Sequence, residues 1–591
     1  MRQRVSFVNK VTSEHSFRFH WFALLLYSAL AIGMTLPLAL QMSDHLLGTD
    51  SNALNDTFFS VWIFGWQAHQ LIADPVNLFQ GNIFFPFPNT LAFSEIILPG
   101  ALLYLPLAYA TQNPVLAYNL VVLSSFPLNG FAMYLYALDW LATTDREQHL
   151  PSSSSPHALR HTRYAALLAG IIFAFCTYKM GELRHVQLLM AMFMPLTLLY
   201  VARWARRPNL RNSLLTALFF SLNALSSLYY AVFLAFAILL YVIVDFALRR
   251  YRLTRAHLAF GALAALSAAA LVAPFVLPLL QIERQYNFSA GRNPRLFSAR
   301  PYSYLAAPAS QWLYGNLTRA FYVASKGQPL FPGLAATALS ILGAVALMTR
   351  KNRAWIFPVL LAALGFILSF GPDLILGRTT VAALPFPLPY EYLARVVTPL
   401  KGLNAPSRFV VLSMLALGLL AAYGARAWMQ RAPRWASWIT AACALALVLE
   451  YIPAPLRLTP VEAGANVSPL YAYLAQQPRG AALVHIPMGA PTFADQDKYV
   501  AYTYSALYHP YQPIVNGYST FIPPDYYALV RDMQDFPTRR KINRLQAWGA
   551  QWVVVHSDLL KQPQAMRDKL ARLPGIEHVQ DFGALWLYRI R

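Results

Sequence analysis

The stretch AGIIFAFCTYKMGELRHVQLLMAMFMPLTLLYVARW, residues 169–204, contains two apolar runs separated by one short charged turn. The first run extends back to residue 164 and the second covers residues 185–202, so both lengths are near the roughly 17–25 residues that a transmembrane helix needs. Charges gather in the turn and after the second run, where Arg203 begins a basic cluster. The stretch therefore predicts a hairpin of two membrane-spanning helices, and similar runs recur from residue 20 to about residue 453.

The composition of the whole chain agrees with many such helices. Of its 591 residues, 57% are hydrophobic and 12% are charged, whereas soluble domains contain about 25% charged residues. Many of the basic residues behind the net charge of +22 lie in short loops between apolar runs, as is typical of membrane proteins, and this charge gives no reason to expect a nucleic-acid partner. Cys176 and Cys443 both lie inside apolar runs, which predicts neither a disulfide framework nor a zinc site.

Twelve segments are predicted to span the membrane. They are residues 20–40, 96–111, 114–141, 164–178, 185–202, 212–226, 228–248, 257–280, 330–349, 354–371, 407–428 and 436–453. The first is expected to remain in the protein rather than to be removed as a signal peptide, because it lacks a convincing small-residue cleavage site.

Basic clusters orient these segments. They follow the spans that end near residues 202, 248, 349 and 428, and the positive-inside rule assigns such clusters to the cytoplasm. Residues 41–95, 281–329, 372–406 and the tail after residue 454 are then expected outside the cytoplasm. A cytoplasmic N-terminus and an external tail require an odd number of spans, so the set of twelve contains one error. We expect it to be a merged or missed span near residues 57–141.

Residues 455–591 differ in character from the rest of the chain. Short strand-like runs at 481–486, 551–556 and 584–590 alternate with helical patterns at 469–477 and 538–548. Such alternation predicts a small α/β domain. We therefore divide the chain into a membrane domain, residues 1–454, and an external α/β domain, residues 455–591. A tyrosine-rich run at 502–527 fits an aromatic carbohydrate-binding surface and a packed core equally well.

The first external segment, residues 41–95, contains five acidic residues and no lysine or arginine. Aromatic and polar side chains recur at helical spacing in residues 58–75, which is typical of a helix lying in the membrane interface. Asp56 precedes this helix, so it either caps the helix or presents a carboxylate to a site. For Asp50 the alternative is a solvated loop residue, and for Glu95 it is another helix cap.

Two further external segments carry informative charges. The turn within residues 169–204 gathers four ionisable groups, which at a membrane surface indicate a site, although snorkelling side chains and one ion pair explain them as well. They are Lys179, Glu182, Arg184 and His185. The segment 281–329 is basic on the side where orientation does not require it, and arginine forks suit phosphate recognition. A solvated basic face is the alternative. Its candidate residues are Arg292, Arg295 and Lys326.

Several stretches together resemble the GT-C superfamily of membrane glycosyltransferases, which use polyprenyl-phosphate-linked sugars. They resemble more closely a group of bacterial multi-pass membrane proteins placed near that superfamily. The stretches are Asp56 with FFSVWIFGW, NPVLAYNLVVLSSFPLNGFAMYLYAL (113–138), residues 169–204, PLFPG (329–333), LSFGP (368–372) and APSRF (405–409). The resemblance covers residues 50–410. One departure is Gln328, because similar chains often carry an acid just before the LFPG element.

The resemblance implies roles for particular residues. An acid in the first external loop of the superfamily is the general base or a metal-positioning group, which assigns catalysis to Asp56, or else to Asp50. The same two acids are the candidates for holding a divalent cation, Mg²⁺ or Mn²⁺. A departing phosphate needs cations, and the candidates are Lys179, Arg184, His185, Arg292, Arg295 and Lys326. Acceptor-binding or structural roles are assigned to Glu95, Glu182, Trp62 and Trp66.

The resulting prediction is an integral membrane glycosyltransferase of a bacterial inner membrane. It would transfer a sugar from a polyprenyl-phosphate donor to a glycan or lipid acceptor on the external face. A transporter or flippase of lipid-linked glycans is one alternative, but it would need charged or broken helices near the membrane midplane. A non-catalytic protein of envelope assembly, whose acids are only caps, is another. No P-loop or G-x-G-x-x-G motif is present, so the chain offers no nucleotide-phosphate site.

Overall fold

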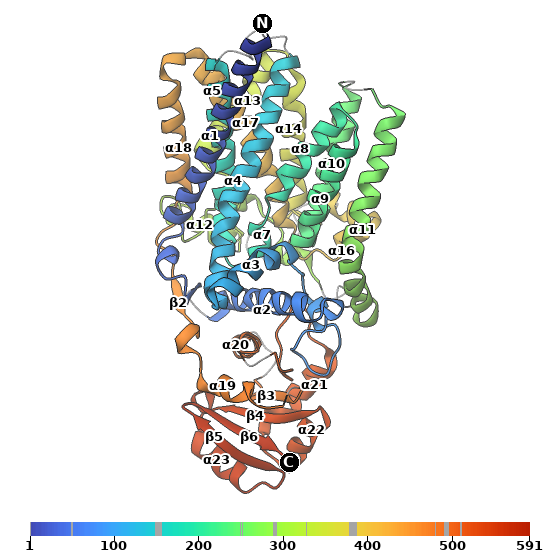
Figure 1. The fold of residues 1–591 in the computed structure, drawn as a ribbon, viewed down its shortest axis with the longest axis vertical. Helices are drawn as coiled ribbons and strands as arrows, with labels where there is room; N and C mark the ends of the chain where they lie inside the picture. The colour runs from blue at the N-terminus through green and yellow to red at the C-terminus, as the bar shows by residue number, and fades with distance from the viewer. Residues whose placement is uncertain are drawn as a thin grey trace.

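The structure is a computed structural model that describes residues 2–48, 51–147, 156–248, 250, 252–287, 292–326, 328–376, 387–478, 480–489, 496–508 and 511–591. Long helices form a bundle, and a smaller part that contains a sheet lies at one end of it (Figure 1). We call this end of the bundle the domain end, and the opposite end, which holds the N-terminus, the far end. The predicted class is confirmed: an α-helical polytopic membrane protein with a C-terminal α/β region.

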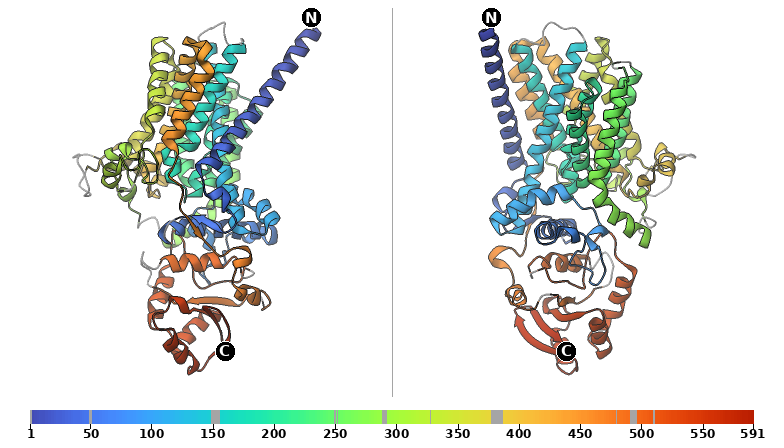
Figure 2. Two further views of the ribbon diagram at one scale, coloured as in Figure 1. Left: turned by 90° about the vertical axis from the view of Figure 1, so that its left-hand side faces the viewer. Right: turned by 45° about the vertical axis from the view of Figure 1, so that its right-hand side comes forward.

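The helices of the bundle run between the two ends. They are α1 (Arg2–Met34), α4 (Pro114–Glu147), α5 (Pro156–Phe175), α8 (Phe193–Arg206), α9 (Leu210–Ser226), α10 (Leu228–Ala247), α11 (Arg255–Tyr286), α13 (Leu334–Thr349), α14 (Ile356–Ser369), α17 (Val410–Arg431) and α18 (Ala436–Tyr451). Within the described residues, seven helical segments are long and apolar enough to cross a membrane. Helix α1 diverges from its neighbours toward the N-terminus (Figure 2), and large apolar side chains of α1 and α11 are exposed, as expected for surfaces that face lipid.

One segment predicted to span the membrane returns to the end at which it started. Helix α3 (Leu98–Thr111) corresponds to the predicted span 96–111, but both of its flanks are held at the domain end. Before it, Glu95 accepts hydrogen bonds from the first residues of α10, and after it, Asn113 donates to the carbonyl oxygen of Ser43. Without α3 the predicted spans number eleven, which is odd, so no span was merged or missed.

Helix α2 (Ser51–Ala73) lies across the domain end of the bundle (Figure 1). It begins five residues before Asp56, so this acid stands in the second helical turn and is not the N-cap that the sequence allowed. No proline or glycine interrupts residues 51–56, and helix formation therefore extends through them. Asp56 is thus held by a rigid helix rather than by a loop.

The aromatic side chains of α2 are buried between the bundle and the C-terminal part. Trp62 and Trp66 each donate an indole N–H to a neighbouring oxygen at 2.9 Å and are at most 6% exposed. Phe58 packs against Tyr504 of α20 (Gln496–Ser505), with ring centroids 4.6 Å apart. The C-terminal part covers this face of α2, so Trp62 and Trp66 pack inside the protein, and the placement of α2 in the membrane interface stays a prediction. Both tryptophans have structural roles here.

The C-terminal part is built on a four-stranded sheet of order β3-β4-β6-β5. Strands β3 and β4 are parallel, and the other neighbours are antiparallel. The strands are β3 (Ala482–Ile486), β4 (Ala550–His556), β5 (Ile576–Phe582) and β6 (Leu585–Ile590). Three of them match the predicted strands, whereas β5 was missed because most of its side chains are polar and exposed. The accompanying helices are α19 (Pro469–Ala475), α21 (Pro524–Asp532), α22 (Arg539–Ala547) and α23 (Pro563–Ala571).

Short elements connect the bundle to this part. Strand β1 (His45–Leu47) pairs antiparallel with β2 (Leu458–Pro460), which ties the start of the tail to the segment after α1. The remaining short helices at the domain end are α6 (Thr177–Gly181), α7 (Val186–Leu189), α12 (Arg319–Ala324), α15 (Pro389–Val396) and α16 (Thr398–Lys401). Of the tyrosine-rich run, Tyr502, Tyr504 and Tyr526 are at most 4% exposed, so these rings are core residues, and His509 lies outside the described residues.

Glycines allow α13 and α17 to approach closely. A Cβ atom added to Gly343 would lie under 3.0 Å from the carbonyl oxygen of Leu420, and one added to Gly424 would lie equally close to that of Leu339. Backbone atoms cannot move aside without separating the two helices. Small residues at a crossing are the usual way in which transmembrane helices come this close.

The variant Gly343→Val is therefore expected to lose stability by at least the roughly 1–3 kcal/mol typical of overpacking. Size-exclusion chromatography and thermal unfolding of the detergent-solubilised protein would measure this loss. Gly33→Val is the matched control, because a Cβ at Gly33 meets no atom within 4 Å. Equal unfolding temperatures for the two variants would contradict the close packing of α13 and α17.

Candidate functional site

A charged cluster lies at the domain end, where α2 meets the turn that follows α5. His185 lies between two carboxylates: its Nε2 is 3.1 Å from Asp56 Oδ2, and its Nδ1 is 2.5 Å from Glu182 Oε2. The Nε atom of Arg184 is 4.0 Å from the same Asp56 oxygen. The acid of the first external segment and the charged turn were separate predictions from sequence, and the structure brings them together.

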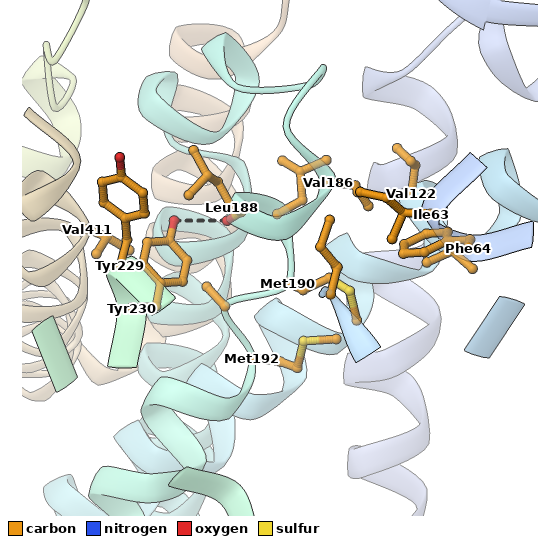
Figure 3. Close-up of a cluster of buried hydrophobic side chains, with 14 of the residues drawn as sticks. Ile63, Phe64, Val122, Val186, Leu188, Met190, Met192, Tyr229, Tyr230 and Val411 are labelled. Carbon is orange, nitrogen blue, oxygen red and sulfur yellow. Dashed lines mark hydrogen bonds between the residues drawn. The ribbon is translucent and has the colours of Figure 1, made fainter. Parts of the chain in front are cut away.

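The turn is held from inside by Lys179. This residue is 1% exposed, its Nζ donates to the carbonyl oxygen of Leu188, and it lies 5.3 Å from the centroid of the Tyr230 ring. The Tyr230 hydroxyl donates to the same carbonyl at 2.9 Å, as the dashed line in Figure 3 shows. The structure thus places the ammonium group beneath the turn, among apolar side chains. Of the two cations of this turn, Arg184 rather than Lys179 is therefore the candidate for binding phosphate.

Arg408 is a further residue of the cluster that sequence reasoning left without a role. It lies in the 3-10 helix η9 (Pro406–Phe409) that leads into α17, and its guanidinium carbon is 4.7 Å from the centroid of the Tyr229 ring. Its charge interacts with the carboxylates of Glu182 and Glu95. The available signal was one charged residue at the entrance of an otherwise apolar span, inside the stretch APSRF.

The charges in the cluster reinforce one another. Burial alone would lower the pKa of His185, but the Glu182 carboxylate and the hydrogen bond to Asp56 outweigh it and raise that pKa. Burial alone would raise the pKa of Glu182, but the charge and hydrogen bond of His185 lower it to about 2. For Asp56, burial is likewise outweighed by the hydrogen bond and charge of His185 and by the charge of Arg184, and the pKa is lowered. An imidazolium therefore bridges two carboxylates.

One oxygen of Asp56 is available for a ligand. Both ion-pair contacts of this residue involve Oδ2, whereas Oδ1 makes no hydrogen bond or ion pair with any residue that the structure describes. The side chain is 39% exposed. The helix and the imidazolium thus fix the carboxylate while its second oxygen can accept a proton or a hydrogen bond.

The coupling predicts a pH window for stability. A raised histidine pKa contributes stability that is complete below the ordinary value of 6.5 and is lost as the pH rises through the raised value. A depressed carboxyl pKa contributes stability that is complete above the ordinary value of 4.5 and is lost as the pH falls toward about 2. Glu182→Gln should therefore be most destabilised relative to wild type between about pH 4.5 and 6.5. Thermal unfolding across pH measures this difference, and a difference that grows above pH 8 would contradict the ion pair.

Other predicted site residues have partners outside this cluster. Glu95 accepts from the backbone N–H of Leu228 at 2.9 Å and from the Ser227 hydroxyl at 3.1 Å, so it caps α10 rather than the span that follows it in sequence. Arg292 donates to the carbonyl oxygen of Gly402.

Among the described residues, Arg295 and Lys326 make no hydrogen bond or ion pair with the cluster either. Arg295 forms an ion pair with Asp373 at 2.5 Å, and Lys326 is exposed. Asp50 lies outside the described residues. The structure therefore joins Asp56, Glu182, Arg184 and His185 of the predicted set, whereas Arg292 and Arg295 bind other partners.

The described residues of the cluster do not fit a metal site. Both ring nitrogens of His185 are engaged with carboxylates. Across the part of the chain that the structure describes, no group of three or more histidine, cysteine, aspartate or glutamate side chains could hold a metal ion. The described residues of the cluster therefore offer no set of ligands for a divalent cation.

The fold and the cluster define a class: a polytopic helical membrane protein whose charged site lies between the bundle and a C-terminal α/β part. No protein-family model and no curated protein matches the chain. Among solved structures it is similar to ArnT from Cupriavidus metallidurans, both in the apo state (12% identity, 98% of this chain and 98% of that chain covered, TM-score 0.43) and bound to undecaprenyl phosphate (12%, 95% and 97%, 0.42). It is also similar to the Archaeoglobus fulgidus oligosaccharyltransferase tethered to an acceptor peptide (12%, 91% and 69%, 0.36).

Proposed function

We propose that this chain is an integral membrane glycosyltransferase. It transfers a sugar from a polyprenyl-phosphate donor to a glycan or lipid acceptor on the external face of a bacterial inner membrane. The observation that carries the proposal is the carboxylate of Asp56, which has one free oxygen and stands beside three cationic groups at one end of a membrane bundle. The cationic groups are Arg184, His185 and Arg408.

The orientation follows from the loops at the far end. Basic clusters occupy the connections after α8, α10, α13 and α17, and such clusters stay in the cytoplasm. The domain end, with Asp56 and the C-terminal part, is then external. Polyprenyl-phosphate sugars present their head groups at a membrane surface, so a site at the end of the bundle suits them better than one at its midplane.

The transfer reaction needs one base and several cations. The acceptor hydroxyl donates a hydrogen bond to Asp56 Oδ1, and its oxygen attacks the anomeric carbon of the donor sugar. A new carbon–oxygen bond forms as the bond from that carbon to the phosphate oxygen breaks, and the electron pair leaves with the phosphate. The proton passes to Asp56. The products are the glycosylated acceptor and the polyprenyl phosphate.

The depressed pKa of Asp56 is compatible with this role. A carboxylate of low pKa is a weak base, but a phosphate is a good leaving group, so the proton is transferred late, when the acceptor oxygen has become acidic. The contact between His185 and Oδ2 orients the carboxylate toward the acceptor. Fixed positive charges stabilise the charge that develops on the departing phosphate.

The proposal is tested with purified protein in proteoliposomes supplied with a labelled polyprenyl-phosphate hexose or pentose and a lipid acceptor. We expect the labelled sugar to appear in the acceptor, and free polyprenyl phosphate to be released in an equal amount. If the labelled donor crosses the bilayer without formation of a new glycosidic bond, the protein is a transporter. If neither transfer nor movement occurs with any donor, the cluster has a structural role and the proposal fails.

A further inference from the structure

Arg408 is a cation of the cluster that has no protein hydrogen-bond partner. Its guanidinium makes no hydrogen bond, and no ion pair within 4.0 Å, with any residue that the structure describes. Arginines nearby in the fold behave differently. Arg292 donates to a backbone carbonyl, Arg295 pairs with Asp373, and Arg184 lies 4.0 Å from Asp56. Five N–H donors of one guanidinium therefore remain unused.

These donors are not sealed inside the core. Arg408 is half-buried, and none of its nitrogens belongs to the buried polar atoms that lack a partner. A buried, unbonded guanidinium would be costly, whereas an accessible one can be hydrated until a ligand displaces the water. The side chain is thus available for an incoming acceptor of hydrogen bonds.

The surroundings hold Arg408 in place without using its donors. The Tyr229 ring supports the guanidinium from 4.7 Å, and the hydroxyl of this tyrosine accepts from the backbone N–H of Asn404 at 2.9 Å. The neighbouring hydroxyl of Ser407 donates to the Gln328 side chain at 2.9 Å. The segment that carries Arg408 is therefore fixed on both sides before any ligand arrives.

The nearby carboxylates are already committed to other groups. Glu182 pairs with His185, and Glu95 accepts from the first residues of α10. Their negative charges attract the guanidinium of Arg408 and stabilise its positive charge in this half-buried position. They make no hydrogen bond with it, so its N–H donors stay free. What is missing is an acceptor with two oxygens at the spacing of the guanidinium fork.

We infer that Arg408 binds the phosphate group of the donor, and of the polyprenyl phosphate product, through two parallel N–H···O bonds. Planar guanidinium groups bind phosphate oxygens in this bidentate way. The inference rests on the proposed function, and it assigns the bidentate contact with the leaving phosphate to Arg408. The charge of Arg408 also acts on Asp56, so a phosphate on Arg408 and an acceptor hydroxyl on Asp56 would belong to one site.

The test measures binding without requiring transfer. Purified wild type, Arg408→Gln and Arg408→Lys are titrated in nanodiscs with a polyprenyl phosphate, with the corresponding polyprenol, and with inorganic phosphate as a competitor. Arg395→Gln is the matched control, because Arg395 belongs to the same end of the bundle and is 63% exposed. We expect Arg408→Gln to bind the polyprenyl phosphate about 10- to 100-fold more weakly, to bind the polyprenol as wild type does, and Arg395→Gln to bind both as wild type does.

The lysine variant and the competitor sharpen the result. Arg408→Lys keeps the charge but loses the fork, so it should bind with intermediate affinity, and it remains informative if the glutamine variant does not fold. Competition by millimolar inorganic phosphate in wild type but not in Arg408→Gln would show that phosphate alone suffices. If inorganic phosphate competes in neither protein, the lipid chain must accompany the phosphate group for binding. Unchanged affinity of both Arg408 variants for the polyprenyl phosphate would overturn the inference.

The two proposals fail separately. Arg408-dependent binding with no transfer to any acceptor would leave the phosphate site in place and remove the transferase function. If Asp56→Asn loses transfer activity while Arg408→Gln keeps both this activity and the wild-type affinity for the polyprenyl phosphate, the transferase function stands and the phosphate site at Arg408 is refuted.

Discussion

Asp56→Asn is expected to reduce kcat/KM for sugar transfer by about 10²- to 10⁴-fold, the usual contribution of a positioned general base. The amide has nearly the same shape as the carboxylate, and the helix around it begins at Ser51, so the fold does not depend on an acid at this position. The amide cannot take the acceptor proton, and it no longer carries the charge that pairs with His185. Rates with a labelled polyprenyl-phosphate sugar and a lipid acceptor measure the effect.

Asp74→Asn is the control for this experiment. Asp74 belongs to the same acidic segment, and its carboxylate accepts from the Asn77 amide at 2.7 Å, away from the cluster. We expect it to retain wild-type activity. If Asp56→Asn keeps more than about a tenth of the wild-type kcat/KM, the base lies elsewhere, and Asp50 becomes the next residue to substitute.

His185→Gln is expected to move the acid limb of the pH–rate profile to higher pH. The hydrogen bond and charge of His185 lower the pKa of Asp56 against the effect of burial. Glutamine can keep a hydrogen bond but not the charge, so the pKa of Asp56 should rise, and activity at pH 5 should fall more than activity at pH 8. An opposite charge at this distance shifts a carboxyl pKa by about 1–3 units. We therefore expect the acid limb of the pH profile of kcat/KM to move up by at least about one pH unit.

His69→Gln provides the matched control for the pH profile. His69 lies on the same helix but stacks on Tyr511, with ring centroids 3.7 Å apart. Its removal should leave the acid limb where it is in wild type. An unchanged acid limb in His185→Gln, with activity lowered equally at all pH values, would mean that His185 acts only through packing.

The membrane class of the chain could be read from the sequence because span length and hydropathy are local properties. The runs around residues 169–204 and 228–248 form α5, α8 and α10, although α5 begins eight residues before and α8 eight residues after the predicted start. The segment 96–111 was misassigned because hydropathy does not report where the flanks of a helix are anchored. The anchors of α3 include the bond of Glu95 to α10, more than 100 residues later.

The candidate site was only partly predictable for a similar reason. Asp56 and the turn 179–185 stood out as charges beside apolar runs, and the structure joins them. The burial of Lys179 and the unpaired guanidinium of Arg408 depend on contacts between distant segments, such as that between Arg408 and Tyr229. No local pattern distinguishes an ammonium group that supports a turn from one that faces a ligand.

A cryo-electron microscopy structure with bound polyprenyl phosphate tests the central claim most directly. We expect phosphate density at the domain end, within hydrogen-bond distance of the Arg408 guanidinium, on the side that faces the free oxygen of Asp56. The lipid chain should run along the bundle from that point. Phosphate density at the far end, or at the domain end but out of reach of both residues, would contradict the account.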